Sequence, residues 1–263
     1  MILDVLAQGA RERVAKKRAE RSLPSVRREA ELLAKSRLSY SFESALRGPG
    51  IAVIAEVKKA SPSKGMIAPN GEFPYLDIAR EYEKSGADAI SVLTEPEHFL
   101  GRDAYLEQIA AAVQLPVLRK DFTVDEYQIF EAKTLGASAV LLICAITEAE
   151  RLKAYLAAAD SVGLAALVEA HSEAEIETAI AAGARIIGVN NRDLKDFSVN
   201  TGNAAALRKN VPADILFVAE SGITSGADTR LLLDAGVDAV LVGEAVMLAQ
   251  DRAAFIAELK RGE

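Results

Sequence analysis

The sequence has no tryptophan, one cysteine and two histidines among its 263 residues. Cys144, within the apolar run "AVLLICAI", has no second cysteine to pair with, which excludes an internal disulfide and a multi-cysteine metal site. His98 and His171 lie too far apart along the chain to form a metal motif on their own. The sequence therefore offers no cysteine or histidine motif for a metal site.

Long apolar runs are also missing. No run approaches eighteen residues, and the first 20 residues carry charges where a signal peptide needs an apolar centre. A net charge of −7 argues against general affinity for nucleic acid. We therefore expect a cytoplasmic protein without membrane or nucleic-acid partners.

The charge is unevenly distributed. Residues 11–29 carry eight basic and three acidic side chains, so this stretch is basic within an acidic chain. Most such runs are solvated helix faces, because like charges along a helix need only water. A basic cover over an anionic ligand site is the alternative, and the sequence leaves both open.

A repeated junction dominates the rest of the chain. Helix-like stretches end in glycine and an apolar run follows, as in "EKSGADAISVL", "KTLGASAVLLI", "IAAGARIIGVN" and "LDAGVDAVLVG". The opposite ends of the units are marked by capping boxes or close variants, which begin at Thr123, Thr147, Ser172 and Ser225. The chain therefore consists of successive strand–helix units.

Eight candidate strands begin near residues 51, 88, 116, 138, 164, 185, 214 and 238. Each is a nearly continuous apolar run, as a parallel strand buried on both faces requires. Eight such units without a Gly-x-Gly-x-x-Gly turn predict an α/β protein with a closed (β/α)8 barrel. We predict that residues 1–263 form a single barrel domain, with residues 1–48 as an N-terminal helical extension that covers one end.

Charged and polar residues end several of these apolar strands, at the edge where such barrels place their sites. They are Glu56, Lys58, Arg119, Lys120, Asp121, Glu169, Asn190, Asn191, Glu220 and Ser221. Burying one unpaired charge costs several kcal/mol, so converging ionisable residues need either mutual pairing or a function. A structural ion-pair network is one reading, and a catalytic set of acids and bases is the favoured one.

Glycines follow the last two strands. Gly222, and Gly243 with Glu244, predict backbone amides that hold a phosphate, although each glycine also fits a simple turn. Ser61, in the loop after the first strand, has a hydroxyl that can donate to the same anion, and loop serines also form turns. The expected partner is a small phosphorylated molecule.

Seven motifs, in this order, resemble the indole-3-glycerol phosphate synthase family of tryptophan biosynthesis: "AEVKKASPSKG", "SVLTEPEHFLG", "PVLRKDF", "LVEAH", "GVNNRDL", "VAESGI" and "LVGEAVM". The resemblance covers essentially the whole chain, and the first and third motifs are its most specific parts. It implies a cofactor-free carboxy-lyase. Such an enzyme closes the ring of 1-(2-carboxyphenylamino)-1-deoxyribulose 5-phosphate and releases carbon dioxide and water.

The resemblance also implies roles for individual residues. Lys120 matches the general acid and Glu169 the general base, Lys58 holds the substrate carboxylate and serves as a second acid, and Glu56 orients a lysine. The remaining matches position the substrate (Asn190, Arg192, Glu220 and Ser221), hold its phosphate (Ser61, Gly222, Gly243 and the backbone amide of Glu244) or form an apolar slot for its ring (Pro62, Phe99, Phe122, Leu141 and Leu194). For the slot residues, ordinary core packing remains an equal reading.

Some features depart from the family or stay unassigned. Without tryptophan, any cover over the substrate ring must use other residues. We assign His98 no role, place His171 in a loop, and expect Lys59 to face away from the site. Arg119 and Asp121 are expected to point between barrel and helices.

The alternatives to a synthase are another sugar-phosphate barrel enzyme, such as a phosphoribosylanthranilate isomerase, and a non-catalytic phosphate-binding barrel. The cysteine or aspartate facing a second carboxylate that an isomerase needs is not visible, and the intact charge set opposes a non-catalytic barrel. We expect the chain to act as a monomer.

Overall fold

The computed structural model describes residues 2–36, 41–68, 72–192 and 197–263. Within these ranges, eight parallel strands close into a barrel in the order β1-β10-β9-β8-β7-β6-β5-β4. They are β1 (Ala52–Val57), β4 (Ala89–Leu93), β5 (Val117–Lys120), β6 (Ala139–Ile143), β7 (Ala165–Ala170), β8 (Ile186–Asn190), β9 (Leu216–Glu220) and β10 (Ala239–Val242). Each predicted strand start lies within two residues of an observed one, and the predicted barrel is confirmed.

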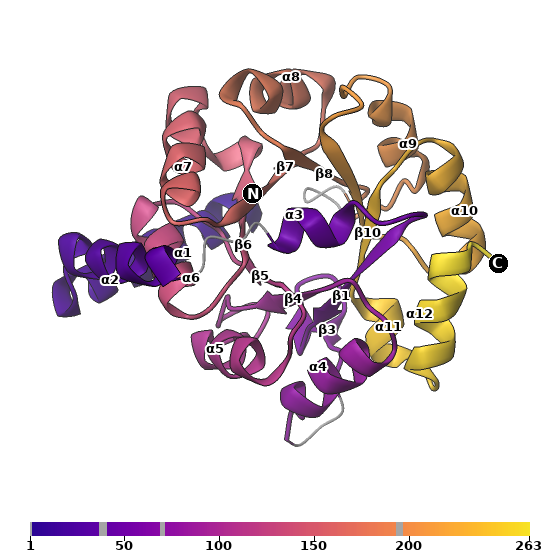
Figure 1. The fold of residues 1–263 in the computed structure, drawn as a ribbon, viewed down its shortest axis with the longest axis horizontal. Helices are drawn as coiled ribbons and strands as arrows, with labels where there is room; N and C mark the ends of the chain where they lie inside the picture. The colour runs from indigo at the N-terminus through magenta and orange to yellow at the C-terminus, as the bar shows by residue number, and fades with distance from the viewer. Residues whose placement is uncertain (1, 37–40, 69–71, 193–196) are drawn as a thin grey trace.

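Most helices lie around the outside of the barrel, whereas α3 (Ser41–Leu46) lies across its centre in the view of Figure 1. The helices are α1 (Ile2–Glu20), α2 (Leu23–Ser36), α3 (Ser41–Leu46), α4 (Tyr75–Lys84), α5 (Asp103–Ala112), α6 (Glu126–Thr134), α7 (Ala149–Ser161), α8 (Glu173–Ala182), α9 (Gly202–Arg208), α10 (Gly226–Asp234), α11 (Glu244–Leu248) and α12 (Arg252–Arg261), with a short 3-10 turn η1 (Cys144–Ile146). In the part of the chain that is described, no helix has the length and apolar character needed to span a bilayer.

A small ribbon interrupts the first strand–helix connection. β2 (Ala60–Ser61) and β3 (Gly65–Met66) pair antiparallel within the "ASPSKGM" segment. The sequence analysis expected a loop here. The pairing gives the loop a fixed shape, with Ser61 in the ribbon and residues 62–64 in the turn that joins its two strands.

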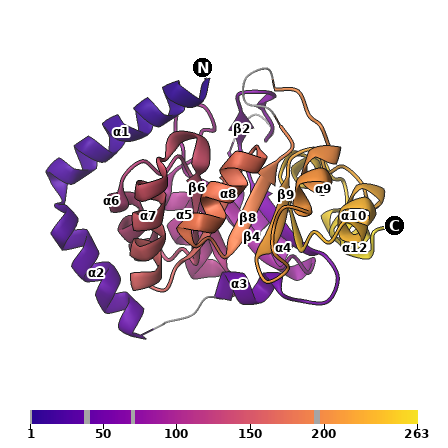
Figure 2. The same ribbon diagram turned by 90° about the horizontal axis from the view of Figure 1, so that it is seen from above.

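The N-terminal helices reach both ends of the barrel. Figure 2 shows α1 starting at the end where β2 lies, α2 running along the side, and α3 at the opposite end. Phe42 and Leu46 of α3 are buried and belong to the same hydrophobic cluster as the barrel interior, which includes the small residues Ala52 and Ala239 at the starts of strands. This distribution is broader than the single end expected from the sequence.

The basic residues of α1 contact the barrel. Lys17 pairs with Asp103 on α5 and, at 2.8 Å, with Glu131 on α6, while Arg18 pairs with Asp125 at 2.8 Å. The charge of this stretch therefore matches acidic side chains of the neighbouring helices. The sequence left two interpretations of this basic stretch, a solvated helix face and a cover over a ligand. The ion pairs of Lys17 and Arg18 with neighbouring helices fit neither of them.

Local signals at the helix ends were mostly read correctly. The predicted glycines have a positive φ, between 82° and 94°, at Gly86, Gly136, Gly183 and Gly236. Ser225 forms the full capping box and Ser172 accepts from the Glu175 amide. The boxes at Thr123 and Thr147 were wrong: the carboxylate of Asp125 caps α6, and α7 has no side-chain cap. An Asp closer to the first turn displaced the more distant Thr.

Strand alternation divides the core into two parts. Along β1, Val53, Ala55 and Val57 belong to the layer between strands and helices, whereas Ala52 and Ile54 fill the barrel interior. Because side chains alternate with a period of two, the next inward positions belong to the site. The hydrophobic interior therefore ends, at the carboxyl edge of the barrel, in a layer of polar residues.

Candidate active site

A cavity of about 510 Å³ opens at the carboxyl ends of the strands. Sixteen of the seventeen site residues predicted from the sequence line it: Glu56, Lys58, Ser61, Pro62, Phe99, Lys120, Phe122, Leu141, Glu169, Asn190, Arg192, Glu220, Ser221, Gly222, Gly243 and Glu244. The remaining one, Leu194, lies outside the described residues. Residues that are up to 188 positions apart in sequence thus share one pocket, and their individual roles stay predictions.

Lys120 lies at the centre of the charged layer. Its ammonium nitrogen donates to Glu220 Oε2 at 2.5 Å and to Glu169 Oε2 at 3.3 Å. The three side chains come from β5, β9 and β7, and both carboxylates are almost completely buried. A cation held between two buried carboxylates on different strands forms only when the barrel closes, because no local segment brings them together.

Proton affinities within this triad differ. Burial opposes the charged form of Lys120, but Glu220 and Glu169 outweigh it and raise the Lys120 pKa well above the ordinary value. Burial also works against the Glu169 carboxylate, yet Lys120 holds its pKa below the usual range. Burial, together with repulsion from Glu169, raises the pKa of Glu220 to about 7 despite Lys120. Near neutral pH, Lys120 therefore carries a proton, Glu169 is an acceptor, and Glu220 exchanges protons readily.

A second ion pair faces the same cavity from β1. Lys58 Nζ lies 2.7 Å from Glu56 Oε1, and both side chains continue the inward series of Ala52 and Ile54. Lys59 does not line the cavity, in agreement with the expectation that it faces away. Because of this alternation, adjacent lysines in one motif have different surroundings.

Two glycines make room for the close approach of these carboxylates. A Cβ on Gly243 would lie 2.4 Å from Glu56 Oε1 and 2.8 Å from Lys58 Nζ. A Cβ on Gly188, in the middle of β8, would lie 2.4 Å from Glu220 Oε1. Each glycine makes the space into which a charged side chain folds. Gly188 was missed by the sequence analysis, although a glycine inside an apolar strand is itself a signal of close approach.

The turn after β9 has an unusual backbone. Ser221 has a φ of 64° and Gly222 a φ of 77°, so a non-glycine residue occupies the left-handed region at the cavity wall. That conformation costs a side-chain-bearing residue about 1–2 kcal/mol. Asn191 braces the turn, because its side-chain amide donates to the Ser221 carbonyl at 3.0 Å and its backbone amide donates to the Glu220 carbonyl at 2.8 Å. Asn191, directly after β8, therefore holds the strained backbone of Ser221 in place.

Two aromatic side chains contribute an apolar part of the cavity wall. The rings of Phe99 and Phe122 have centroids 6.2 Å apart and an interplanar angle of 43°. The loop that carries Phe99 is wound around the buried carboxylate of Glu95, which accepts from the Glu97, His98 and Phe99 backbone amides at 2.8–3.0 Å. The slot is thus held by backbone hydrogen bonds as well as by packing.

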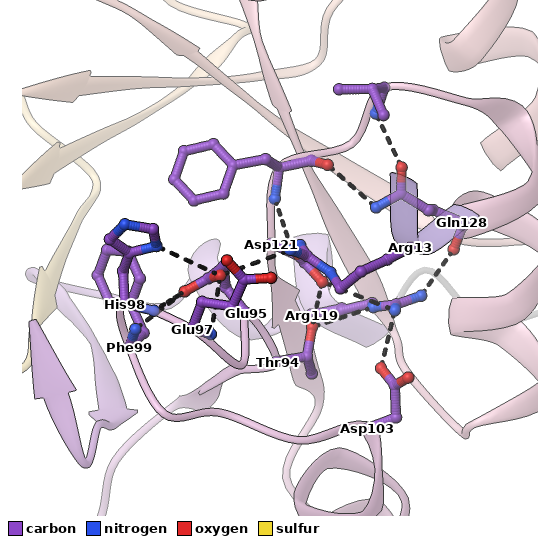
Figure 3. A network of polar contacts seen from close by, with 12 residues as sticks. Arg13, Thr94, Glu95, Glu97, His98, Phe99, Asp103, Arg119, Asp121 and Gln128 are labelled. Atoms are coloured by element: carbon purple, nitrogen blue, oxygen red, sulfur yellow. Dashed lines mark hydrogen bonds and ion pairs between the residues drawn. The ribbon is translucent and has the colours of Figure 1, made fainter. Parts of the chain in front are cut away.

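Behind Lys120, the outward side of β5 carries a buried polar network (Figure 3). Arg119 donates to Asp103 at 2.8 Å and pairs with Glu131 at 2.9 Å, and Asp121 accepts from Thr94 at 2.7 Å. Arg13 of α1 reaches Asp121 at 3.2 Å. The expectation that Arg119 points between barrel and helices is confirmed, whereas Asp121 contacts Arg13 of α1 and also lines the cavity. The network anchors both the end of β5 and the first helix.

Several lining residues were not found from the sequence. Ile2 and Leu6 of α1 reach the cavity, and Lys64 lies beside it with its ammonium 3.1 Å from Glu244 Oε1. Ile2 and Leu6 lie four residues apart on one helix, and nothing in the sequence around them distinguishes residues that line a cavity from residues that pack in a core. Lys64 lies within the "SPSKG" loop, which was already predicted to border the site, so its position beside the cavity could have been predicted.

No group of three or more metal-ligating side chains with suitable geometry occurs in the ranges that the structure describes. Burial, together with Glu175 and Glu169, raises the pKa of Cys144 to about 12, so the thiol stays protonated near neutral pH.

The closed barrel and the cavity at the carboxyl ends of its strands, lined by buried glutamates and lysines, are typical of an enzyme of the (β/α)8 class. A family model described as indole-3-glycerol phosphate synthase matches residues 3–259. The chain therefore belongs to the indole-3-glycerol phosphate synthase family, and it is a carboxy-lyase of tryptophan biosynthesis.

Relatives that carry the same family name match this chain over essentially their whole length. The chain is 50% identical to the indole-3-glycerol phosphate synthase of Ruminiclostridium cellulolyticum, covering 99% of each chain. It is 51% identical to that of Endomicrobium trichonymphae, covering 99% of this chain and 100% of the relative. The one from Leuconostoc mesenteroides is 49% identical over 100% of both chains.

Solved structures of lower identity share the fold. A 3-hexulose-6-phosphate synthase superimposes with a TM-score of 0.64 at 18% identity, covering 81% of this chain and 99% of that one. KGPDC from Streptococcus mutans gives 0.63 at 12% identity, with 81% and 97% covered. At such identities the likeness shows the barrel and nothing about the reaction.

Proposed function

We propose that the chain converts 1-(2-carboxyphenylamino)-1-deoxyribulose 5-phosphate to indole-3-glycerol phosphate, carbon dioxide and water. The observation that carries this assignment is the Lys120 ammonium held between Glu169 and Glu220 in the cavity. A ring closure of this kind needs a proton donor and a proton acceptor within one substrate length, and the triad supplies both.

The first step joins a ring carbon to a ketone. As the carbon that bears the carboxylate attacks the substrate carbonyl, the carbonyl oxygen develops negative charge and takes the proton of Lys120. A positioned general acid of this type contributes about 10²–10⁴-fold. The carbon–carboxylate bond then breaks, carbon dioxide leaves, and the bonding electron pair returns to the ring.

The second step removes water. Lys58, held by Glu56 at 2.7 Å, donates a proton to the departing hydroxyl. Glu169 takes the proton that the new five-membered ring must lose to become an indole. Two protons are donated and one is recovered, so each turnover takes up one proton, which balances the carboxylate charge that departs as neutral carbon dioxide.

Binding is assigned to the rest of the cavity wall. The phosphate is held by Ser61 and by backbone amides at Gly222, Gly243 and Glu244, and Lys64 neutralises the Glu244 carboxylate. Pro62, Phe99, Phe122 and Leu141 enclose the substrate ring, with Leu194 assigned to the same slot from the resemblance alone. Asn190, Arg192, Glu220 and Ser221 position the hydroxyl and carboxylate groups.

We also propose that residues 1–263 act as one barrel domain with residues 1–48 as its N-terminal extension, that the chain works as a monomer, and that it does so in the cytoplasm. Membership of a tryptophan-biosynthesis family supports the location. Size-exclusion chromatography with light scattering tests the oligomeric state, and a dimer at micromolar concentration would contradict it.

Indole fluorescence tests the activity. Purified protein mixed with the carboxyphenylamino-deoxyribulose phosphate should produce fluorescent indole-3-glycerol phosphate and one equivalent of carbon dioxide. Absence of product at micromolar enzyme would refute the proposal. Turnover of phosphoribosylanthranilate in its place would favour the isomerase, and tight product binding without turnover would favour a non-catalytic barrel.

A further inference from the structure

A histidine that the proposed mechanism does not use lies beside its general base. His171 begins the loop after β7, two residues beyond Glu169, and its Nε2 lies 3.5 Å from Glu169 Oε1. Lys120 approaches the other oxygen, Oε2, at 3.3 Å. His171 and Lys120 therefore approach different oxygens of this buried carboxylate, to which the Asn190 side chain also hydrogen-bonds.

The imidazole is held in this place by the start of α8. Its Nδ1 lies 3.6 Å from Glu175 Oε2, and the same oxygen accepts from the His171 backbone amide at 2.7 Å. Glu175 is itself fixed, because its own amide donates to the Ser172 hydroxyl that caps the helix. His171 Nε2 is buried and has no hydrogen-bond partner among the residues that the structure describes. The acceptor nearest at hand is the Glu169 carboxylate.

We infer that His171 is a positioning residue for Glu169, which it orients through Oε1 and whose strength as a base it sets by gaining or losing a proton. The inference rests on the proposed function through the role of Glu169. A structural reading, in which His171 only completes the cap of α8, accounts for the contact with Glu175. It does not account for the buried Nε2 that faces the second carboxylate.

The surroundings of the imidazole are acidic. Glu169 on β7, Glu175 on α8 and Glu220 on β9 all act on it, and Cys144, which is hydrogen-bonded to the Glu175 carbonyl, is neutral. Burial works against the charged imidazole, but these carboxylates raise the pKa of His171 above its ordinary value. The imidazolium therefore persists toward neutral pH.

The charge of His171 changes what Glu169 can do. While the imidazolium is present, Glu169 lies between two cations and is a weak base. When His171 loses its proton, one cation disappears and Glu169 binds a substrate proton more strongly. Base-dependent turnover should therefore rise with pH as His171 deprotonates.

Proton NMR tests the contact without any need for turnover. The chain has only two histidines, and a His98→Asn variant assigns their signals by difference. In a Glu169→Gln variant the His171 titration should move to lower pH, whereas the His98 signal should titrate as in the wild type. An unmoved His171 titration would overturn the inference even if the protein is an active synthase, and this readout stands even if the proposed activity fails.

Kinetics of two variants then separate orientation from charge. His171→Gln keeps a neutral donor with the reach of Nε2, whereas His171→Asn reaches only toward Glu175. We expect Gln to keep kcat within about threefold at pH 8 while losing the dependence on His171 deprotonation. We expect Asn to lose about tenfold in kcat at unchanged KM, part of the 10²–10⁴-fold that a general base contributes.

His98→Asn is the matched control. That histidine also faces a buried carboxylate, with Nδ1 3.8 Å from Glu95 Oε1, but not one assigned to proton transfer. Its pH profile should superimpose on that of the wild type. If both His171 variants also superimpose, or if His98→Asn changes the profile in the same way, His171 has no specific role in positioning Glu169.

Discussion

Replacing Glu220 by glutamine should make the protein more stable and much less active. The Glu220 carboxylate is almost fully buried, and burial with repulsion from Glu169 raises its pKa from 4.5 to about 7 although Lys120 lies 2.5 Å away. An ion pair that existed for stability would lower this pKa. The raised pKa therefore indicates that the charged carboxylate is retained at the expense of stability.

The magnitude follows from proton linkage. Unfolded Glu220 titrates near 4.5 and folded Glu220 near 7, so the unfolded state holds fewer protons between these values and the free energy of unfolding falls as pH rises through the window. At about 1.4 kcal/mol for each tenfold change in proton affinity, the penalty is about 3 kcal/mol above pH 7. Glutamine resembles the protonated form and avoids it.

Urea denaturation at two pH values measures the effect. We expect Glu220→Gln to exceed the wild type by about 1–3 kcal/mol in the free energy of unfolding at pH 8, and by much less at pH 5. Turnover should fall at both. Glu131→Gln is the matched control, because Glu131 pairs with the buried Arg119 at 2.9 Å away from the cavity and its loss should destabilise by about 1–3 kcal/mol. Comparable destabilisation in both variants would refute the reasoning and make Glu220 a structural partner.

Other substitutions test the neighbouring parts of the site. Lys58→Met should lower kcat by about 10²-fold or more, whereas Lys59→Met, outside the cavity, should stay within about twofold; equal losses would contradict the alternation argument. Gly243→Ala should leave far-UV circular dichroism unchanged and lower kcat, because its Cβ would lie 2.4 Å from Glu56 Oε1, and wild-type kcat would show that this pair is not needed. Ser221→Gly should gain up to about 1 kcal/mol against urea by relieving the positive φ while turnover drops, and a loss of stability would refute strain at that turn.

The fold could be predicted because its signals are local. Buried parallel strands read as apolar runs, and helix ends carry glycines whose left-handed backbone the structure confirms. The position of the charged layer could also be predicted, since Glu56 and Lys58 continue an inward series with a period of two. The predicted helix caps at Thr123 and Thr147 were wrong. Asp125 lies nearer to the start of α6 and caps it, and no side chain caps α7.

What escaped prediction depends on distant parts of the chain. Ile2 and Leu6 reach the cavity only because α1 is anchored at the barrel mouth by contacts such as Arg13 with Asp121, over 100 residues away. The contact of His171 with Glu169 needed the placement of α8, although the same-face spacing of the two residues was visible. Packing between units decides such contacts, and it leaves no mark in the sequence around each residue.

The most direct test of the central claim compares wild-type protein with Lys120→Ala in the carboxyphenylamino-deoxyribulose phosphate reaction, with substrate binding measured separately by calorimetry. If Lys120 is the proton donor held ready by Glu169 and Glu220, the variant should bind substrate within a few-fold of wild type and lose about 10²–10⁴-fold or more in kcat. Unchanged turnover in Lys120→Ala would contradict the account, because the charged layer would then be an ion-pair network without a catalytic acid.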